Sequence, residues 1–444
     1  MKKISQLIQG LLALILLQTV FITPAFVAAE GSDAIPKTTA QSAIVIDSRN
    51  GQILFEHQSD ELVEVASVSK LLTVYLVLKS VQEGQMALSD PVSISDYAYQ
   101  VSQDYDVSNV PLRQDETYTI EELLESVMIA LANGSTIALA EHVAGDEASF
   151  VNLMEAQLAT WQIEESLLLN ATGLTDQYDP NDSDSIEKGQ QNQLSAEAVA
   201  VIAYHLVQEF PEIVELSSAN RQLFRKGTSD EFEMTNYNLM LPEREQTYDQ
   251  VDGLILGTSV NDGGSFVGTT ERNGFRVISV VLGTEHELER YHETKKLFDY
   301  VYSAYMLEEV VLKDESVTQI SQIRISNGTR DVAPIIYGQD LVLIVPVVDT
   351  APRLSYEFIP GDELEEKGEL TAPIEQGTTI GQVAINVTTN PAEFLNSTQG
   401  NQVDVVLAET VDSAPWYTLT WQFISESTSG GWDNTRRFFM EVFN

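Results

Sequence analysis

Apolar and polar residues alternate near the start of the chain and then give way to a block with helical periodicity. Residues 41–57 alternate on either side of Asn50-Gly51, a dipeptide favoured in tight hairpin turns, and predict a β-hairpin. Beyond it, apolar positions recur every three to four residues, several times after a Ser, Thr or Asp that can cap a helix. This spacing predicts helices over residues 68–83, 119–131, 136–144, 148–160 and 195–209.

Strand patterns return after the helical block. Short apolar runs punctuated by glycine predict strands in residues 252–256, 265–270 and 275–282, and the spacing over residues 287–306 predicts a long helix. A strand pair, a block of helices, further strands and a closing helix are typical of an α/β fold, a mixed sheet with helices packed on it.

From about Leu307 the pattern changes to short strand-like runs separated by Gly, Pro and Asn. The runs occupy residues 317–325, 341–348, 379–387 and 402–407. They predict an all-β module. We therefore expect a main domain over residues 30–307, an all-β domain over residues 308–410, and a linker with a terminal segment over residues 411–444.

The first 29 residues have the pattern of a secretory signal peptide. Lys2 and Lys3 precede the apolar run 11–17, and the small residues Val27-Ala28-Ala29 form a cleavage site before Glu30. A retained membrane anchor is the alternative, but the apolar run is short for a membrane span. We expect an exported protein that begins near Glu30.

The last fifteen residues, 430–444, predict an amphipathic helix. Trp432, Arg436, Phe439 and Phe443 share one helical face, and Arg437 lies beside it. Aromatic and basic residues together suit a helix that lies on a membrane surface, here the extracellular face of the cell membrane. The alternative is a helix docked on the all-β domain.

Composition and charge exclude several classes of function. The chain of 444 residues has no cysteine, which excludes thiol catalysis and Cys-ligated metals, and its five histidines show no ligand spacing. We expect no metal and no cofactor. The formal net charge is −43, and removing residues 1–29, which carry two lysines and no acid, leaves −45. Such a charge repels phosphates, so nucleic acid is not an expected partner.

Ser67-Val68-Ser69-Lys70 is the strongest chemical signal in the chain. A serine and a lysine three residues apart share one helix face, and the segment runs on into the apolar stretch 71–78. If burial lowers the pKa of the Lys70 amine, it can take the proton of the Ser67 hydroxyl and make it a nucleophile. The motif alone is common, so its surroundings decide its meaning.

With these surroundings, the chain resembles the low-molecular-mass penicillin-binding proteins, which are secreted serine-type D-alanyl-D-alanine carboxypeptidases. Four stretches besides 65–70 support the likeness: Ala138 to Gly145, Asn170 to Leu174, Met234 to Asn238, and Val251-Asp252-Gly253 followed by Gly257-Thr258-Ser259. The resemblance implies the penicillin-binding, serine β-lactamase-like transpeptidase fold with an appended all-β domain. It also implies that S-x-x-K, S-x-N and K-T-G motifs meet in one cleft.

Only the first of these motifs is intact. The S-x-N position reads Leu131-Ala132-Asn133, and the K-T-G position reads Ile255-Leu256-Gly257. By resemblance, Ser67 is the nucleophile, Lys70 the base and Asn133 the residue that holds the peptide. Gly257 and Thr258 bind substrate, and the N–H groups of Ser67 and Thr258 form the oxyanion hole. Leu131 also continues the apolar positions of its helix, so packing is a second interpretation of it.

The resemblance implies a carboxypeptidase that trims peptidoglycan stem peptides through an acyl-enzyme on Ser67, weakened by Leu131, Ile255 and Leu256. It also implies β-lactams as covalent ligands. A catalytically dead homologue that binds the cell wall or regulates partners is the alternative. A β-lactamase fits less well, because the sequence shows no recognisable deacylating glutamate motif and carries the all-β domain and terminal segment.

Overall fold

The structure, a computed structural model, describes residues 35–347, 353–362, 364, 368–387, 392–396 and 400–415. The predicted signal peptide and the predicted C-terminal amphipathic helix therefore lie outside the described residues. Within them, no helix is both long enough and apolar enough to cross a membrane.

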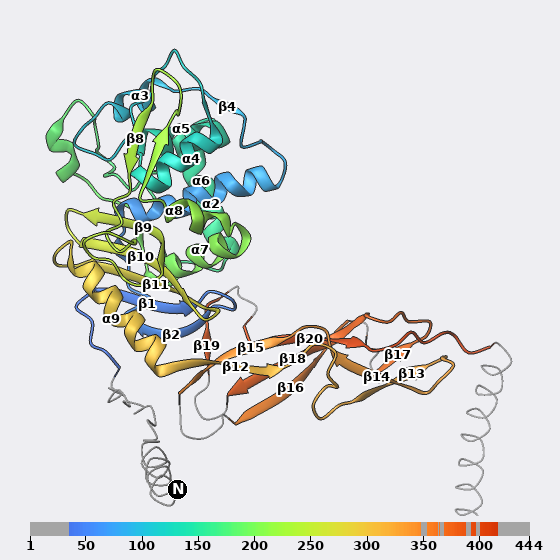
Figure 1. Cartoon of the computed structure of the whole chain (residues 1–444). Helices are drawn as coiled ribbons and strands as arrows, with labels where there is room; N and C mark the ends of the chain where they lie inside the picture. The colour runs from blue at the N-terminus through green and yellow to red at the C-terminus, as the bar shows by residue number, and fades with distance from the viewer. Residues whose placement is uncertain are drawn as a thin grey trace, which may run out of the picture. The chain divides into compact units, whose positions relative to one another are not determined.

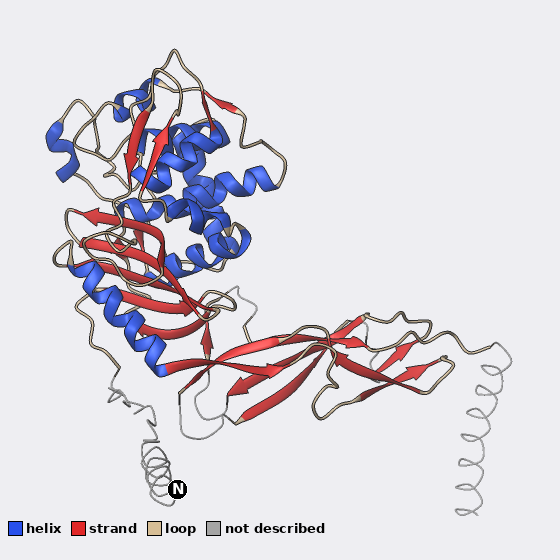
Figure 2. Cartoon of the chain, viewed as in Figure 1, coloured by secondary structure: helices blue, strands red, loops and turns tan. Residues whose placement is uncertain are grey.

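A six-stranded antiparallel sheet forms the centre of the N-terminal part, in the order β19-β2-β1-β11-β10-β9 (Figures 1 and 2). Its strands are β1 (Ser42–Asp47), β2 (Gln52–His57), β9 (Val251–Ser259), β10 (Gly263–Arg272), β11 (Phe275–Thr284) and β19 (Glu393–Phe394). The predicted hairpin is confirmed: β1 and β2 pair, and Gly51 has φ 74° in the turn between them. The sequence analysis did not predict β19, which comes from the β-rich part of the chain.

Helices cover both faces of this sheet. Ile44 and Ile46 of β1 pack into the core that contains α7, whereas Ala43 and Val45 pack into the core that contains α9. Figure 2 shows α9 on one side of the sheet and the other helices on the opposite side. The helices are η1 (Ala66–Ser69), α2 (Lys70–Gln82), α3 (Asp96–Ser102), α4 (Ile120–Ala130), α5 (Asn133–Ala144), α6 (Glu147–Thr160), η2 (Ser183–Glu187), α7 (Ala196–Glu209), α8 (Glu212–Ser217) and α9 (Glu289–Ala304).

Most predicted helix bounds agree with the structure to within two residues, and two differences bear on the site. The predicted helix 136–144 begins earlier, at Asn133, because its first N–H finds an acceptor in the Ser108 carbonyl. The predicted helix 68–83 is a 3-10 turn, η1, followed by α2, so Ser67 lies in the 3-10 turn and Lys70 opens the α-helix.

Small two-stranded sheets lie between the helices. One pairs β3 (Val63–Glu64) with β6 (Gln193–Leu194), just ahead of Ser67. The other two pair β4 (Pro91–Val92) with β5 (Tyr118–Thr119), and β7 (Arg221–Phe224) with β8 (Phe232–Thr235). The β3 to β6 pairing fixes the chain that leads into the Ser67 turn.

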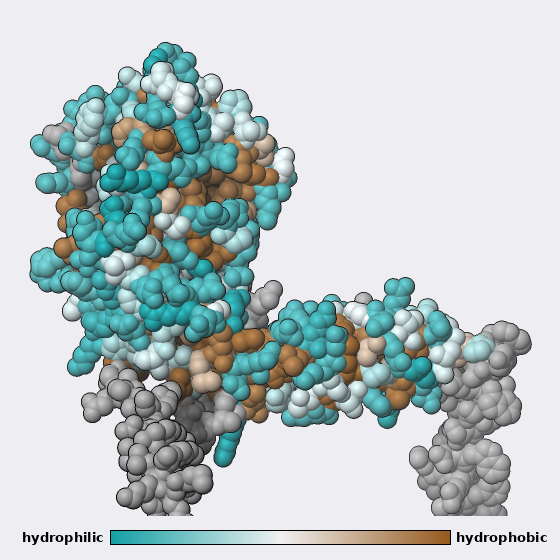
Figure 3. All heavy atoms as spheres, viewed as in Figure 1, coloured by the Kyte–Doolittle hydropathy of each residue, from teal (hydrophilic) through white to brown (hydrophobic). Residues whose placement is uncertain are grey.

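The C-terminal part is β-rich, as the sequence predicts. A six-stranded sheet has the order β16-β18-β20-β14-β13-β17, and β12 pairs with β15. The strands are β12 (Tyr305–Val311), β13 (Gln322–Ser326), β14 (Val332–Tyr337), β15 (Leu341–Pro346), β16 (Leu354–Pro360), β17 (Glu369–Thr371), β18 (Thr379–Val387) and β20 (Gln402–Leu407). Figure 3 shows brown apolar residues among hydrophilic ones, both along these strands and on the main domain.

Several contacts join this β-rich part to the main sheet, and two of them involve strand β2. The buried Gln52 side chain donates to the Ile344 carbonyl at 2.9 Å and accepts from the Ile344 N–H at 3.3 Å, as a neighbouring strand would. The strand β19 pairs with β2, and Leu395 just after it is buried in the main core. The β-rich part therefore contributes residues to the edge of the main sheet.

Candidate active site

The serine and lysine of the S-x-x-K motif are in direct contact. Lys70 Nζ lies 2.9 Å from Ser67 Oγ and donates a second hydrogen bond, of 2.6 Å, to the Thr172 carbonyl. Lys70 is fully buried, whereas Ser67 is partly exposed. Burial lowers the pKa of Lys70 to about 7, because the charged ammonium loses its hydration. A substantial fraction of Lys70 is therefore neutral near pH 7 and able to accept the Ser67 proton.

The loop 170–174 holds the Thr172 carbonyl against Lys70. Asn170 Oδ1 accepts from the N–H groups of Thr172 and Gly173, at 3.1 and 2.7 Å. Gly173 has φ 79°, and a Cβ at this position would lie 1.9 Å from the Ala66 carbonyl oxygen. Only glycine fits there, so the loop can pack directly on the Ser67 turn.

Asn133 lies at the first turn of α5, and the hydrogen bond of its side chain goes to another segment of the chain. Its Nδ2 donates to the Ser108 carbonyl at 3.1 Å, and its Oδ1 is buried without a hydrogen-bond partner. The structure thus places Asn133 on the helix that packs against α2, yet gives it no hydrogen bond to Ser67 or Lys70.

Leu131 follows the last residue of α4 and is buried in the same core as Leu124 and Val127. Its φ is 53°, a left-handed conformation that is uncommon for a bulky residue. The interpretation of Leu131 as a packing residue is confirmed, although it ends the helix instead of continuing it.

Strand β9 runs beside the Ser67 turn. A Cβ on Gly257 would lie 2.5 Å from the Val65 carbonyl oxygen and 3.2 Å from Ser67 N, so the strand and the turn are in close contact at this glycine. Ile255 is buried in the core, Leu256 is partly buried, and Thr258 is exposed. The segment therefore presents backbone and the Thr258 hydroxyl beside Ser67, and no cation of its own.

The sequence profile of the D-alanyl-D-alanine carboxypeptidase family matches residues 29–286. The chain belongs to this family. D-alanyl-D-alanine carboxypeptidase DacC of Escherichia coli is 24% identical over 426 residues, which are 96% of this chain and 97% of DacC. The crystal structure of a peptidoglycan synthesis regulatory factor, PBP3 of Streptococcus pneumoniae, is 31% identical, covers 85% of this chain and 100% of that one, and has a TM-score of 0.73.

A third relative carries a β-lactam. Penicillin-binding protein D2 of Listeria monocytogenes in the cefotaxime-bound form is 25% identical, with a TM-score of 0.50 over 61% of this chain and 99% of that one. The solved relatives confirm the penicillin-binding transpeptidase fold expected from the sequence, and the PBP3 match extends through most of the described chain.

Sequence reasoning missed one buried cation beside this family site. Arg290, on α9, donates from Nη1 to the Gly257 carbonyl at 2.7 Å and from Nη2 to Thr258 Oγ1 at 2.9 Å. It is 1% exposed. A basic residue in the first turn of a helix opposes the helix dipole, and this unusual placement was the only signal in the sequence.

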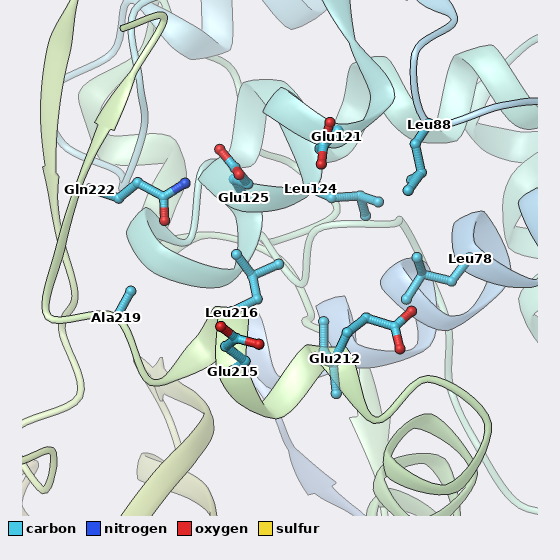
Figure 4. A pocket seen from close by; sticks show the side chains of 11 residues that line it. Leu78, Leu88, Glu121, Leu124, Glu125, Glu212, Glu215, Leu216, Ala219 and Gln222 are labelled. Atoms are coloured by element: carbon cyan, nitrogen blue, oxygen red, sulfur yellow. The ribbon is translucent and has the colours of Figure 1, made fainter.

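A well-formed pocket lies elsewhere in this carboxypeptidase-family chain. A pocket of about 480 Å³ opens between α2, α4, α8 and β7, and Ser67, Lys70 and Asn133 do not line it. Leu78, Leu124 and Leu216 lie between the glutamates of α4 and those of α8 (Figure 4). Among the described residues, no group of three or more His, Asp or Glu is arranged to hold a metal ion.

Proposed function

We propose that this protein is a serine-type D-Ala-D-Ala carboxypeptidase that trims peptidoglycan stem peptides through an acyl-enzyme on Ser67. The observation that carries the proposal is the 2.9 Å contact between Ser67 Oγ and the buried Lys70 Nζ. Membership of the carboxypeptidase family supports the same reaction.

The first half-reaction uses the neutral form of Lys70. Lys70 Nζ takes the proton of Ser67 while Ser67 Oγ bonds to the carbonyl carbon of the penultimate D-alanine. The N–H groups of Ser67 and Thr258 stabilise the resulting oxyanion. Lys70 then returns the proton to the nitrogen of the terminal D-alanine as the C–N bond breaks, which leaves an ester on Ser67.

The second half-reaction consumes one water molecule. Lys70, neutral again, takes a proton from the water as its oxygen attacks the ester carbon. The same proton goes to Ser67 Oγ when the ester bond breaks, so the enzyme is regenerated and the shortened peptide leaves. No side chain of the protein other than Ser67 and Lys70 changes its protonation in this scheme.

Binding of the substrate's terminal carboxylate is expected to be weaker than in a protein with an intact K-T-G motif. Isoleucine and leucine at the K-T-G position supply neither a cation nor a hydroxyl, and a hydrogen bond to a charged group is typically worth ~1.5–3 kcal/mol. Thr258 Oγ1 accepts from Arg290, so its own proton is free to be donated to the carboxylate. Thr258 is therefore the proposed contact for the substrate carboxylate, and Asn133 the proposed contact for the peptide.

We propose two further partners, one at Ser67 and one at the end of the chain. Penicillin-binding protein D2 of Listeria monocytogenes is in a cefotaxime-bound form, and we expect β-lactams to acylate Ser67 of this chain. A membrane surface is the expected partner of residues 430–444, with the protein exported to the extracellular face of the cell membrane.

A second candidate function is favoured by the altered motifs. Three apolar residues, Leu131, Ile255 and Leu256, stand where the family motifs have polar ones. A cell-wall binding or regulatory protein that binds wall peptides without hydrolysing them keeps the fold but does not need the polar motif residues.

Release of D-alanine from a stem pentapeptide distinguishes the two functions. The mature protein is expected to release D-alanine slowly, and Ser67→Ala to release none. Ser80→Ala is a matched control, since Ser80 is a buried serine on α2, the helix that follows the Ser67 turn, and donates to the Leu76 carbonyl. Binding of the pentapeptide without release by folded protein would favour the second candidate.

A further inference from the structure

A buried carboxylate links the Ser67 turn to the end of strand β9. Glu64 Oε2 accepts a 2.6 Å hydrogen bond from Ser259 Oγ, and both residues are buried. Asn261 Nδ2 donates to the same carboxylate at 3.1 and 3.2 Å. We call this set of contacts the Glu64–Ser259 link. It joins residues 195 positions apart in the sequence.

The link also fixes the turn between β9 and β10. Ser259 Oγ accepts from the N–H groups of Asn261 and Asp262, each at 3.1 Å, while it donates to Glu64. The Asp262 carboxylate in turn accepts from the Glu64 N–H at 2.8 Å. The side chain and the main chain of Glu64 are therefore both bound to this turn.

The two ends of the link flank the proposed oxyanion hole. Glu64 comes three residues before Ser67, and Ser259 directly follows Thr258. Among the described residues, no hydrogen bond connects residues 65–69 with residues 255–258, which touch at Gly257. Packing at Gly257 limits how close the two segments come, and the link connects the residues that flank them.

We propose that Glu64 and Ser259 are positioning residues, which set the spacing between the N–H groups of Ser67 and Thr258. The inference rests on the proposed acyl transfer at Ser67. Hydrogen bonds to a carboxylate are about twice as strong as neutral ones, so a glutamate suits this task better than an amide. A displacement of about 1 Å in such a site costs on the order of a hundredfold in rate. The link acts on the chemical step and leaves ground-state binding of the ligand largely unchanged.

Acylation kinetics with a fluorescent penicillin test the proposal. Varying the penicillin concentration separates its dissociation constant from the first-order acylation rate. Ser259→Ala is expected to lower the acylation rate by about tenfold or more with the dissociation constant unchanged, and Ser259→Thr, which keeps the hydroxyl, to retain most of the rate. Ser217→Ala is the matched control: Ser217 is also buried, and its Oγ lies 3.3 Å from the Asp252 carbonyl at the other end of β9.

Glu64→Gln serves as the second variant, because it keeps the shape and one acceptor while removing the charge. Thermal unfolding of every variant identifies protein that is not folded. An acylation rate of folded Ser259→Ala or Glu64→Gln that equals the wild-type rate overturns the proposal. So does a Ser217→Ala defect as large as that of Ser259→Ala.

Hydrogen exchange tests the Glu64–Ser259 link independently of the proposed function. If wild-type protein is not acylated, the proposed function fails, and amide exchange of residues 64–68 and 254–259 still reports the link. Ser259→Ala is expected to speed amide exchange in both segments. Ser217→Ala is expected to leave the exchange of residues 64–68 and 256–259 unchanged. Unchanged exchange in Ser259→Ala shows that the link does not hold the two segments together.

Discussion

Lys70 Nζ lies 2.9 Å from Ser67 Oγ, and the lysine is completely buried. The proximity comes from the short 3-10 turn before α2, and the loop 170–174 supplies the Thr172 carbonyl as the second acceptor of the ammonium. The proximity and the burial make a lysine with a pKa of about 7 the immediate neighbour of a hydroxyl.

The first prediction concerns pH. Because burial lowers the pKa of Lys70 to about 7, the neutral base is scarce below this pH and dominant above it. The acylation rate with a fluorescent penicillin is expected to rise about tenfold per pH unit well below pH 7 and to level off above it. A rate that keeps rising to pH 10 would show that Lys70 has its ordinary pKa.

The second prediction restores the K-T-G position. Ile255→Lys with Leu256→Thr is expected to raise acylation by at least about tenfold, through the regained charge-assisted contact. Adding Leu131→Ser is expected to raise it further, because it restores the serine hydroxyl of the S-x-N position. The apolar double variant Ile255→Met with Leu256→Val is the control. Equal rates in all four proteins would contradict the assigned motif positions.

A comparison of two glycines tests how the site is packed. Gly173→Ala is expected to abolish acylation and to lower the unfolding temperature strongly, because its Cβ would overlap the Ala66 carbonyl. Gly84 has a similar φ of 72° but nothing within 4 Å of a Cβ, so Gly84→Ala is expected to cost only about 1–2 kcal/mol. If the two variants unfold at the same temperature and acylate equally, the loop does not pack on the Ser67 turn as described.

Local patterns in the sequence predicted most of the elements but not how their side chains meet. The hairpin over 41–57 and the long helix before residue 306 follow from periodicity, which depends on near neighbours. The 3-10 turn at Ser67 was not predicted, because its shape depends on Gly173, a residue about one hundred positions later.

The side chains around the site show the same limit. The Ser67 and Lys70 motif alone indicates that Lys70 must be buried if it is to act as a base. The motif does not predict that the Thr172 carbonyl accepts from Lys70, nor how the Asn133 side chain is oriented. Arg290 and the Glu64–Ser259 link join distant segments, and nothing in their local sequence indicates a partner. Such contacts exist only once β9 has joined the edge of the sheet and α9 has packed on it.

The fourth prediction concerns residues 430–444, which lie outside the described residues. Truncation before Gly430 is expected to release the mature protein from membranes without lowering its unfolding temperature, because Trp432, Phe439 and Phe443 would insert into lipid and not into a protein core. High salt is expected to strengthen attachment of the full chain, since it screens the repulsion between an acidic protein and anionic lipid. Truncated protein that stays on the membrane, or melts much lower, would make this segment structural.

Covalent labelling of Ser67 tests the central claim most directly. The mature protein is incubated with a fluorescent penicillin, separated by denaturing electrophoresis, and the labelled peptide is identified by mass spectrometry. The account predicts a labelled band with the adduct on Ser67, the same band in Ser80→Ala, and none in Ser67→Ala. Correctly folded wild-type protein that takes up no label, or a label that persists in Ser67→Ala, would contradict it.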